Sequence, residues 1–377
     1  MVWRMRAVSR MLCTRPGIWL GSLLVLGLAL GACKSEPTGT SAGTSDPPSP
    51  AQARRRGDTT KSPASTTGTP PAKPGGPPGN NLDLDNVRPP DSCLGLERVP
   101  SRYPAAQRIV AIGDLHGDLA ATRKVLALAG AIDDKDRWIG GNLVIVQTGD
   151  ILDRGDDEQA IFDLLDALDK QARAAGGAVH VLNGNHELMN ASGDFRYVTP
   201  AGLVDFADVK SLNTASSDVK ALPKKERARA AALFPGGPYA MLLARHNIII
   251  LVGDTVFVHG GVLPEHVAYG IEQINRETRC WLYGGGTPPM AVTDDNSPVW
   301  ERRYSMPPYE CATLDKTLTG LGAARMVVGH TTQEKGIRAA CKKHVWMIDT
   351  GLSSYYGGPV QALEIRGADV RVLGKDR

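Results

Sequence analysis

Six side chains of types that bind metals stand beside glycine in five short segments of this 377-residue sequence. The six are Asp114, His116, Asp150, Asn185, His259 and His330. Imidazole and carboxylate groups without thiolate suit zinc, iron or manganese. Six ligands are too many for one tetrahedral site with an open position. The set therefore predicts two metal ions that share a bridging carboxylate.

Each segment ends an apolar run that is typical of a buried strand. The first three runs cover 108–114, 142–150 and 178–187, and amphipathic helices are expected between them over 118–131 and 157–176. This alternating order predicts an α/β fold with a sheet that is at least partly parallel. Ligands gather at the carboxyl ends of strands in such sheets, so the six side chains are expected to meet there.

The rest of the chain predicts more strands and one insertion. Strands are expected within 247–261, 325–331, 344–351 and 360–367. A helical insertion is expected from about 200 to 234, and a loop region over 262–310. Glycine beside each ligand lets two backbone segments approach without a Cβ between them.

The motifs GDxHG, GDxxDRG, GNHE, HGG and GHT follow one another from residue 113 to 331. In this order they resemble the phosphoprotein phosphatase family of calcineurin-like metallophosphoesterases. The stretches GNHELMNASGDFRYVTP, SPVWERRY and IDTGLSSYYGG resemble its bacterial Shewanella-like branch. The resemblance covers about residues 105 to 373 and implies a β-sandwich of mixed sheets flanked by helices, with the active site at the carboxyl ends of the strands.

The resemblance also implies roles for the six ligands. Asp114 and His116 would hold one metal, Asp150 would bridge both, and Asn185, His259 and His330 would hold the second. Two ions roughly 3.5–4 Å apart can clamp a phosphate oxygen and supply a hydroxide for in-line attack, because they lower the pKa of water toward about 7.

Five further assignments concern the phosphate and the leaving group. His186 would protonate the leaving oxygen, and Asp153 would orient and stabilise its imidazole. Arg154 would clamp the phosphate, because a guanidinium can meet two of its oxygens at once. Asn185 and His186 would also touch the phosphate. The W-x-R pattern of the branch favours Arg302 over Arg303 as a second clamp.

These residues predict a dinuclear metal phosphomonoesterase, and the resemblance implies a protein phosphatase acting on phosphotyrosine, on phosphoserine and phosphothreonine, or on both kinds of residue. The alternatives are a nucleotide or dinucleoside polyphosphate hydrolase with the same metal core, and a binding lipoprotein that has lost turnover. Substrate preference is expected to come from the insertion around 194–245 and from 262–310. Four histidines without a strand-end glycine are taken as bystanders: His180, His246, His266 and His344.

The first 90 residues predict export. Arg4, Arg6, Arg10 and Arg15 precede an apolar run that ends in Leu30-Gly31-Ala32-Cys33, which resembles a bacterial lipobox. Residues 1–32 are expected to be a lipoprotein signal peptide and Cys33 the lipidated residue, although an ordinary signal peptide or a short anchor remains an alternative. Residues 33–90, rich in Pro, Ser, Gly and Thr, predict a disordered tether before a catalytic domain over 91–377.

Lys34 follows the cysteine where an aspartate would suggest retention in the inner membrane, so a periplasmic protein anchored to the outer membrane is expected. The formal charge of +3 gives no argument for nucleic acid. Four cysteines would remain in the exported domain, Cys93, Cys280, Cys311 and Cys341, and three pairings are open. Cys280 with Cys311 is favoured because that bridge would close a loop-rich stretch.

Overall fold

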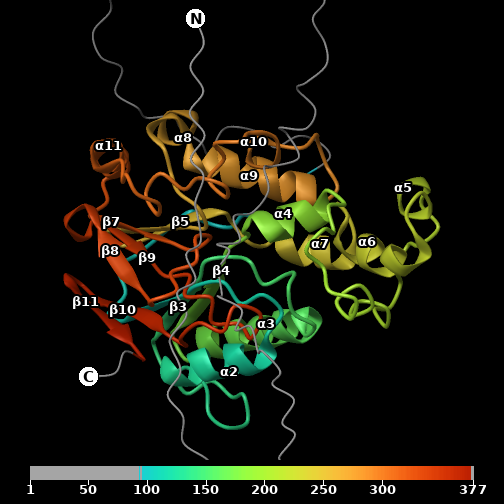
Figure 1. Ribbon diagram of the computed structural model, residues 1–377, viewed down its shortest axis with the longest axis horizontal. Helices are drawn as coiled ribbons and strands as arrows, with labels where there is room; N and C mark the ends of the chain where they lie inside the picture. The colour runs from blue at the N-terminus through green and yellow to red at the C-terminus, as the bar shows by residue number, and fades with distance from the viewer. Residues whose placement is uncertain (1–92, 94–95, 375–377) are drawn as a thin grey trace, which may run out of the picture. The chain divides into compact units, whose positions relative to one another are not determined.

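Two mixed β-sheets pack against each other in this computed structural model, which describes Cys93 and residues 96–374 (Figure 1). One sheet has the strand order β11-β10-β2-β3-β4, and the other has the order β1-β5-β6-β7-β9-β8. Strands β2, β3 and β4 run parallel, and β10 lies antiparallel to β2. The predicted α/β sandwich of mixed sheets is confirmed. The predicted signal peptide, Cys33 and the tether lie outside the described residues.

The first sheet contains β2 (Ile109–Ile112), β3 (Val144–Gln147), β4 (Ala178–Val181), β10 (Ala362–Arg366) and β11 (Asp369–Leu373). The second contains β1 (Arg102–Tyr103), β5 (Ile249–Val252), β6 (Thr255–Val258), β7 (Arg325–Val328), β8 (Arg338–Ala340) and β9 (Val345–Met347). All predicted runs contain strands. The runs forming β1, β8 and β11 were not predicted, since they are short or half exposed and lack a buried apolar pattern.

Alternation along β2 explains how a four-residue strand can be buried on both faces. Ile109 and Ala111 pack between the two sheets, together with Val146 and Phe257. Val110 and Ile112 belong to the larger cluster beneath the helices. Successive side chains of a strand point to opposite faces, so an unbroken apolar run indicates a strand covered on both sides.

Helices cover the outer faces of the sandwich. Helices α2 (Leu119–Leu128) and α3 (Glu158–Ala174) lie together on the side of β3 and β4, and the group containing α8 (Pro264–Tyr269), α9 (Ile271–Leu282), α10 (Met290–Thr293) and α11 (Cys311–Leu321) lies on the opposite side (Figure 1). Asp118 caps α2 by accepting the backbone N–H of Ala121 at 2.8 Å. Within the described residues, no helix combines the length and apolar character needed to cross a membrane.

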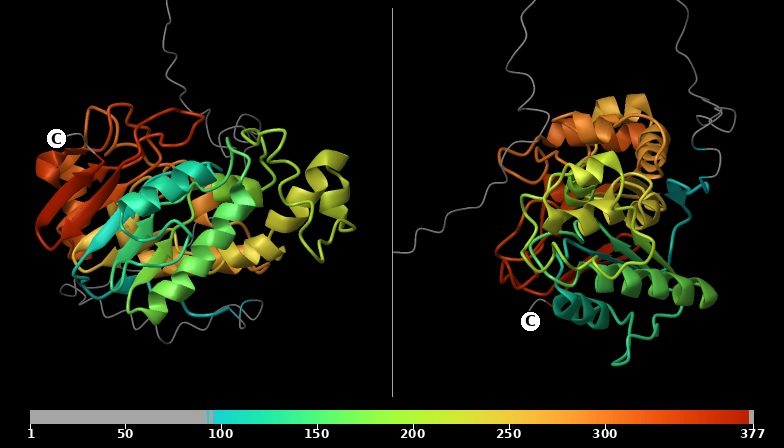
Figure 2. Two further views of the ribbon diagram at one scale, coloured as in Figure 1. Left: turned by 90° about the horizontal axis from the view of Figure 1, so that it is seen from below. Right: turned by 90° about the vertical axis from the view of Figure 1, so that its right-hand side faces the viewer.

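The insertion differs from its prediction. It carries only α5 (Ser217–Lys220), a 3₁₀ turn at Lys224–Glu226 and α6 (Arg227–Leu233), and residues 201–208 form turns. It projects from one end of the sandwich before α7 (Pro238–Leu243), as both Figure 1 and the left view of Figure 2 show. Conversely, the expected loop region over 262–310 contains α8, α9 and α10. The helical spacing of Ile271, Ile274 and Trp281, all buried in α9, was missed.

The favoured disulfide was wrong. Cys280 pairs with Cys93, with 5.6 Å between the Cα atoms, and Cys311 pairs with Cys341 at 5.2 Å. The physical reason is topology: antiparallel β8 and β9 bring the turn after Ala340 next to the start of α11, while Cys280 in α9 faces the segment that precedes β1. Sequence separation gave no guide to either contact.

Candidate active site

The Asp150 carboxylate lies at the centre of the predicted metal site. Its Oδ2 is 3.2 Å from Nε2 of His259 and 3.9 Å from Nε2 of His116. Its side chain belongs to two groups whose ligand atoms all lie within 4.8 Å of one another: His116, Asp150 and His186 form one, and Asp150, His259 and His330 form the other. A residue common to both groups is placed as a bridge between two ions would be.

The other two predicted ligands lie beside these groups. Oδ1 of Asn185 is 2.8 Å from Nε2 of His259. The carboxylate of Asp114 accepts the backbone N–H of His330 at 3.1 Å, and its Oδ1 is 4.0 Å from Nδ1 of His259. The structure therefore brings all six predicted ligands together from segments up to 216 residues apart.

Backbone carbonyls fix the orientation of two imidazoles. Nδ1 of His116 lies 3.0 Å from the carbonyl of Leu152, and Nδ1 of His259 lies 2.9 Å from the carbonyl of Thr148. Each Nδ1 must then carry the proton, so Nε2 presents its lone pair to the site. Nε2 of His330 is buried without a hydrogen-bond partner. These nitrogens suit metal coordination.

The site also holds strained backbone. Of the ten described residues other than glycine with positive φ, half are predicted site residues: His116, Asp150, Asp153, Arg154 and His330. Such conformations cost of order 1–3 kcal/mol each and persist where the surroundings fix them, which is common at active sites.

Close packing of two glycines allows this arrangement. A Cβ at Gly149, which has a φ of 98°, would stand 2.5 Å from the backbone nitrogen of Gly184. A Cβ at Gly184 would stand 2.2 Å from Oδ1 of Asp150. The two strand ends therefore approach closely because neither residue has a side chain, as the sequence predicts.

The buried carboxylates and imidazoles of the site have shifted pKa values that fit the binding of cations. Burial, reinforced by the carboxylates of Asp349 and Asp150, raises the pKa of Asp114 well above its usual range. Burial alone would raise the pKa of Asp150, but the imidazoles of His259 and His186 outweigh it and hold the pKa well below its usual range. Burial lowers the pKa of His116 to about 3, so this imidazole is neutral and able to bind metal. Two divalent ions fit these donors.

His186 and Asp153 lie beside the ligands in a geometry that suits proton transfer. Nδ1 of His186 is 2.5 Å from Oδ2 of Asp153, so Nε2 is the nitrogen left to face the site. That Nε2 is buried, has no hydrogen-bond partner and lies 3.7 Å from Oδ2 of Asp150. The same position also places it within reach of a metal, in the group with His116.

Arg154 lies at the mouth of the site. Its Nη1 is 3.2 Å from Nε2 of His116, and its backbone N–H donates to the carbonyl of Tyr197 at 3.0 Å. Three tyrosine rings surround its guanidinium: Tyr197 at 4.9 Å, Tyr356 at 5.1 Å and Tyr355 at 5.8 Å from the ring centres. Tyr355 and Tyr356 therefore line this mouth.

Arg302 and Arg303 point to different surroundings. Nη1 of Arg302 donates to the carbonyl of His330 and to the hydroxyl of Thr331, both at 3.3 Å. Arg303 instead pairs with Glu301 at 3.4 Å and donates to Asn296 at 2.9 Å. Only Arg302 lies against a predicted ligand, which supports it as the second clamp.

Glu187, the acid of GNHE, holds the loop that carries Asp150. Its carboxylate accepts four backbone N–H groups, from Gly184, Asp150, Ile151 and Leu152, at 2.7–3.1 Å. A carboxylate with four donors fixes two ligand-bearing segments relative to each other.

Sequence reasoning missed three buried residues that lie next to the predicted site residues. Asp349 accepts the hydroxyl of Thr332 and the N–H of Gly351, each at 2.8 Å, and lies near Asp114. Glu158 and Arg229 form a buried ion pair next to Asp153. An arginine among alanines in the segment RARAAAL was the only signal for Arg229, and it resembles an ordinary exposed helix position.

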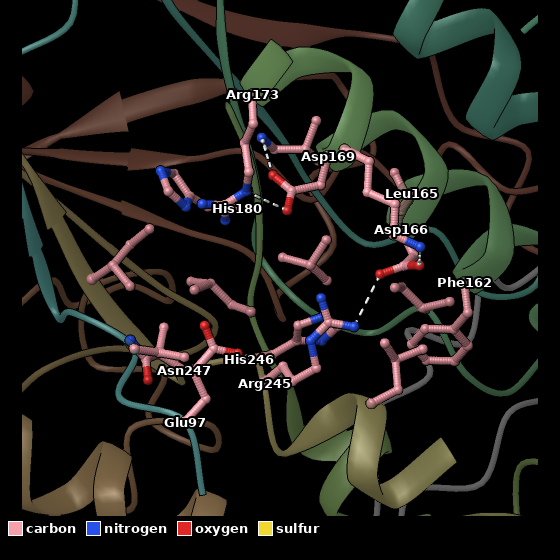
Figure 3. A pocket seen from close by; sticks show the side chains of 18 of the residues that line it. Glu97, Phe162, Leu165, Asp166, Asp169, Arg173, His180, Arg245, His246 and Asn247 are labelled. Atoms are coloured by element: carbon pink, nitrogen blue, oxygen red, sulfur yellow. Dashed lines mark hydrogen bonds and ion pairs between the residues drawn. The ribbon is translucent and has the colours of Figure 1, made fainter. Parts of the chain in front are cut away.

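A separate cavity of about 310 Å³ lies between α3, β4 and residues 242–247 (Figure 3). Four of its charged side chains form two ion pairs: Arg173 with Asp169 at 2.7 Å and Arg245 with Asp166 at 3.1 Å. His180, which also lines it, is one of the histidines taken as bystanders. It lies outside both metal-binding groups.

The comparisons agree with this geometry. Residues 107–333 match the family model of the calcineurin-like phosphoesterases. The chain belongs to this family. It is therefore a metal-dependent phosphoester hydrolase of a family with two metals, and the described residues contain two groups, both including Asp150, that could hold them.

Among curated relatives, Shewanella-like protein phosphatase 2 of Arabidopsis thaliana is 41% identical over 320 residues, covering 76% of this chain and 82% of the relative. Shewanella-like protein phosphatase 1 of Plasmodium berghei is 32% identical and covers 67% and 69%. The predicted Shewanella-like membership of this phosphoesterase is confirmed.

Among solved structures, a cold-active protein-tyrosine phosphatase of a psychrophilic Shewanella species is similar, with a TM-score of 0.57 and 26% identity. The match covers 74% of this chain and 83% of that one.

Proposed function

We propose that this phosphoesterase is a dinuclear metal protein phosphatase with a preference for phosphotyrosine. The observation that carries the proposal is the Asp150 carboxylate, shared by two ligand groups with His186 and Arg154 beside it. The relatives named as protein phosphatases and the similar protein-tyrosine phosphatase support the substrate class.

The chain's own residues account for binding and proton transfer. Arg154 and Arg302 receive the phosphate oxygens, since a guanidinium can donate two parallel hydrogen bonds. Asn185 and His186 would also touch the phosphate. His186 donates a proton from Nε2 to the leaving oxygen while Asp153 holds Nδ1. When bound, the two ions neutralise phosphate charge and lower the pKa of water toward about 7.

Manganese, iron or zinc is the proposed metal, because the donors are imidazoles, carboxylates and an amide. Asp114 and His116 are assigned to one ion, Asn185, His259 and His330 to the other, and Asp150 to both. The assignment is supported by Nε2 of His116 and of His259, which face the site because each Nδ1 lies against a backbone carbonyl, and by the crowded carboxylates.

The tyrosines around Arg154 support the preference for phosphotyrosine. Tyr197, Tyr355 and Tyr356 give the mouth an aromatic wall next to the phosphate clamp. A phosphotyrosyl ring can pack edge to face against such a wall, whereas phosphoserine has no ring to pack.

The test uses the full-length protein with Mn²⁺ and three substrates: a phosphotyrosyl peptide, the matching phosphoseryl peptide and diadenosine tetraphosphate. We expect the highest kcat/KM for the phosphotyrosyl peptide. The His186→Asn variant should lose roughly 10²–10⁴-fold in kcat, which is the usual contribution of a general acid. Fastest turnover of diadenosine tetraphosphate would instead identify a polyphosphate hydrolase.

We further propose that the protein is an exported lipoprotein anchored through Cys33 to the outer membrane. The lipobox-like sequence and the two disulfides support this, because disulfides persist in oxidising compartments. Cell fractionation tests it: the Cys33→Ser variant should move from the membrane to the soluble fraction, and unchanged membrane association would refute the anchor.

A further inference from the structure

Arg229 is completely buried in α6, yet a guanidinium keeps its charge inside a protein. Its nitrogens all find acceptors among neighbouring groups. Nε donates to Asn190 at 2.8 Å, Nη1 to the carbonyl of Gly202 at 2.9 Å, and Nη2 to Asp153 at 3.2 Å. Both Nη1 and Nη2 also donate to the carboxylate of Glu158.

The Asp153 carboxylate is consequently held on both oxygens. Oδ2 accepts from Nδ1 of His186, while Oδ1 accepts from Arg229 and, at 2.9 Å, from Nδ2 of Asn190. Its backbone N–H donates to Glu158, and its φ is 70°. Residues in this strained conformation need surrounding contacts to fix them, and here Glu158 and Arg229 provide them.

Stability alone is a weak reason for such a network. Replacing a buried ion pair by apolar residues is often neutral or stabilising, because removing both charges from water is costly. In this protein, Arg229 and Glu158 both contact Asp153, whose carboxylate orients His186. The arrangement is therefore more informative about the catalytic imidazole than about the fold.

We infer that Arg229, held in place by Glu158, is a positioning residue that fixes Asp153 and, through it, the Nε2 atom of the general acid His186. The inference rests on the proposed function, because it assumes that His186 donates a proton to the leaving oxygen. The insertion thereby gains a second role. Helix α6 belongs to the segment that projects from the sandwich (Figures 1 and 2), yet it supplies part of the support for the acid.

The expected consequence depends on the leaving group. Para-nitrophenolate leaves readily without a proton, whereas phenolate, the leaving group of phenyl phosphate and of phosphotyrosine, needs one. A misplaced general acid should therefore slow phenyl phosphate much more than para-nitrophenyl phosphate. A general loss of structure or of metal would slow both equally.

The test compares full-length Arg229→Gln with Arg227→Gln, a matched change two residues earlier on α6. Among the residues that the structure describes, Arg227 donates to the carbonyls of Leu222 and Lys220 and to no site residue. Arg229→Gln should lower kcat for phenyl phosphate by about 100-fold and for para-nitrophenyl phosphate by less than about 10-fold. KM and metal content should stay within about twofold, and Arg227→Gln should match the wild type.

Two other variants keep the test decisive if Arg229→Gln folds poorly. Arg229→Lys keeps the charge but lacks the planar fork that bridges Asp153 and Glu158. Glu158→Gln keeps the shape and removes the charge that holds Arg229. Each should show the same preferential loss on phenyl phosphate. Equal losses on both esters, or none, would overturn the inference, whereas a wild-type protein that hydrolyses neither ester would overturn the proposed function itself.

Discussion

Two regions of this molecule hold histidines and acids close together, but only one resembles a reaction centre. In the cavity of Figure 3, acids face arginines in pairs, and none of its lining residues has positive φ. In the site around Asp150, acids lie near acids, imidazoles lie near imidazoles, and five residues have positive φ. The two regions meet at Ile151, which follows Asp150 and lines the cavity.

Residue type alone therefore does not identify a site. The cavity is a low-cost arrangement, since both of its arginines have a carboxylate as counterion. The Asp150 site places like groups close together, and bound cations would offset the repulsion between its carboxylates. Variants matched between the two regions, or between neighbouring residues, can test this contrast.

The largest contrast is expected between Asp150→Asn and Asp166→Asn. The first removes the bridging charge and should lower kcat/KM by roughly 10³-fold or more, with loss of bound metal. The second removes one member of a partly exposed pair, which contributes about 0–1 kcal/mol, and should leave activity within about twofold. Steady-state kinetics with metal analysis would check both, and similar losses would remove the distinction.

A smaller contrast is expected between two adjacent arginines. Arg302→Lys should lower kcat/KM by about 10²-fold, because lysine cannot donate two parallel hydrogen bonds to a phosphate. Arg303→Lys should change it by less than about threefold, because Arg303 pairs with Glu301 away from the ligands. A larger effect at Arg303 than at Arg302 would reverse the assignment of the second clamp.

Glu187→Gln should weaken metal binding by about 10–100-fold, the usual effect of losing a group that supports a ligand. The NH2 group of glutamine would face two of the four N–H groups that the carboxylate now accepts, and only the amide oxygen could still accept the other two. Titration of metal-free protein with Mn²⁺ would measure the change. Unchanged affinity would show that the Asp150 loop keeps its shape without this carboxylate.

The smallest effect concerns stability in the cavity. Burial lowers the pKa of His246 to about 4, below its usual value of about 6.5. As pH falls from about 6.5 to 4, the unfolded chain takes up the proton first, so the free energy of unfolding should decrease over that range. Between pH 7 and 4.5, the free energy of unfolding measured with urea should decrease by about 1–2 kcal/mol less in His246→Asn than in the wild type. If the free energy of unfolding depended on pH in the same way in both proteins, the lowered pKa of His246 would be contradicted. The activity of His246→Asn at pH 7 should be unchanged.

Much of the site could be predicted because each ligand is local in sequence to a glycine and a strand end. Gly149 and Gly184, for example, mark the place where two backbone segments approach closely, and the ligands Asp150 and Asn185 follow them directly in the sequence. The parallel strand order then fixes the edge at which they meet.

The remainder depends on contacts that have no local signal. The Cys93–Cys280 pair spans 187 residues, and Arg229 reaches Asp153 from an insertion whose sequence predicts only surface helix. Helix α9 was missed because a polar composition hid the spacing of its buried residues. Tertiary packing decides each of these features.

Anomalous diffraction from crystals of the full-length protein grown with Mn²⁺ would locate the metals themselves. We predict two peaks, one on each side of the Asp150 carboxylate and about 3.5–4 Å apart. A single peak, or peaks that do not flank Asp150, would contradict the bridging role of this carboxylate.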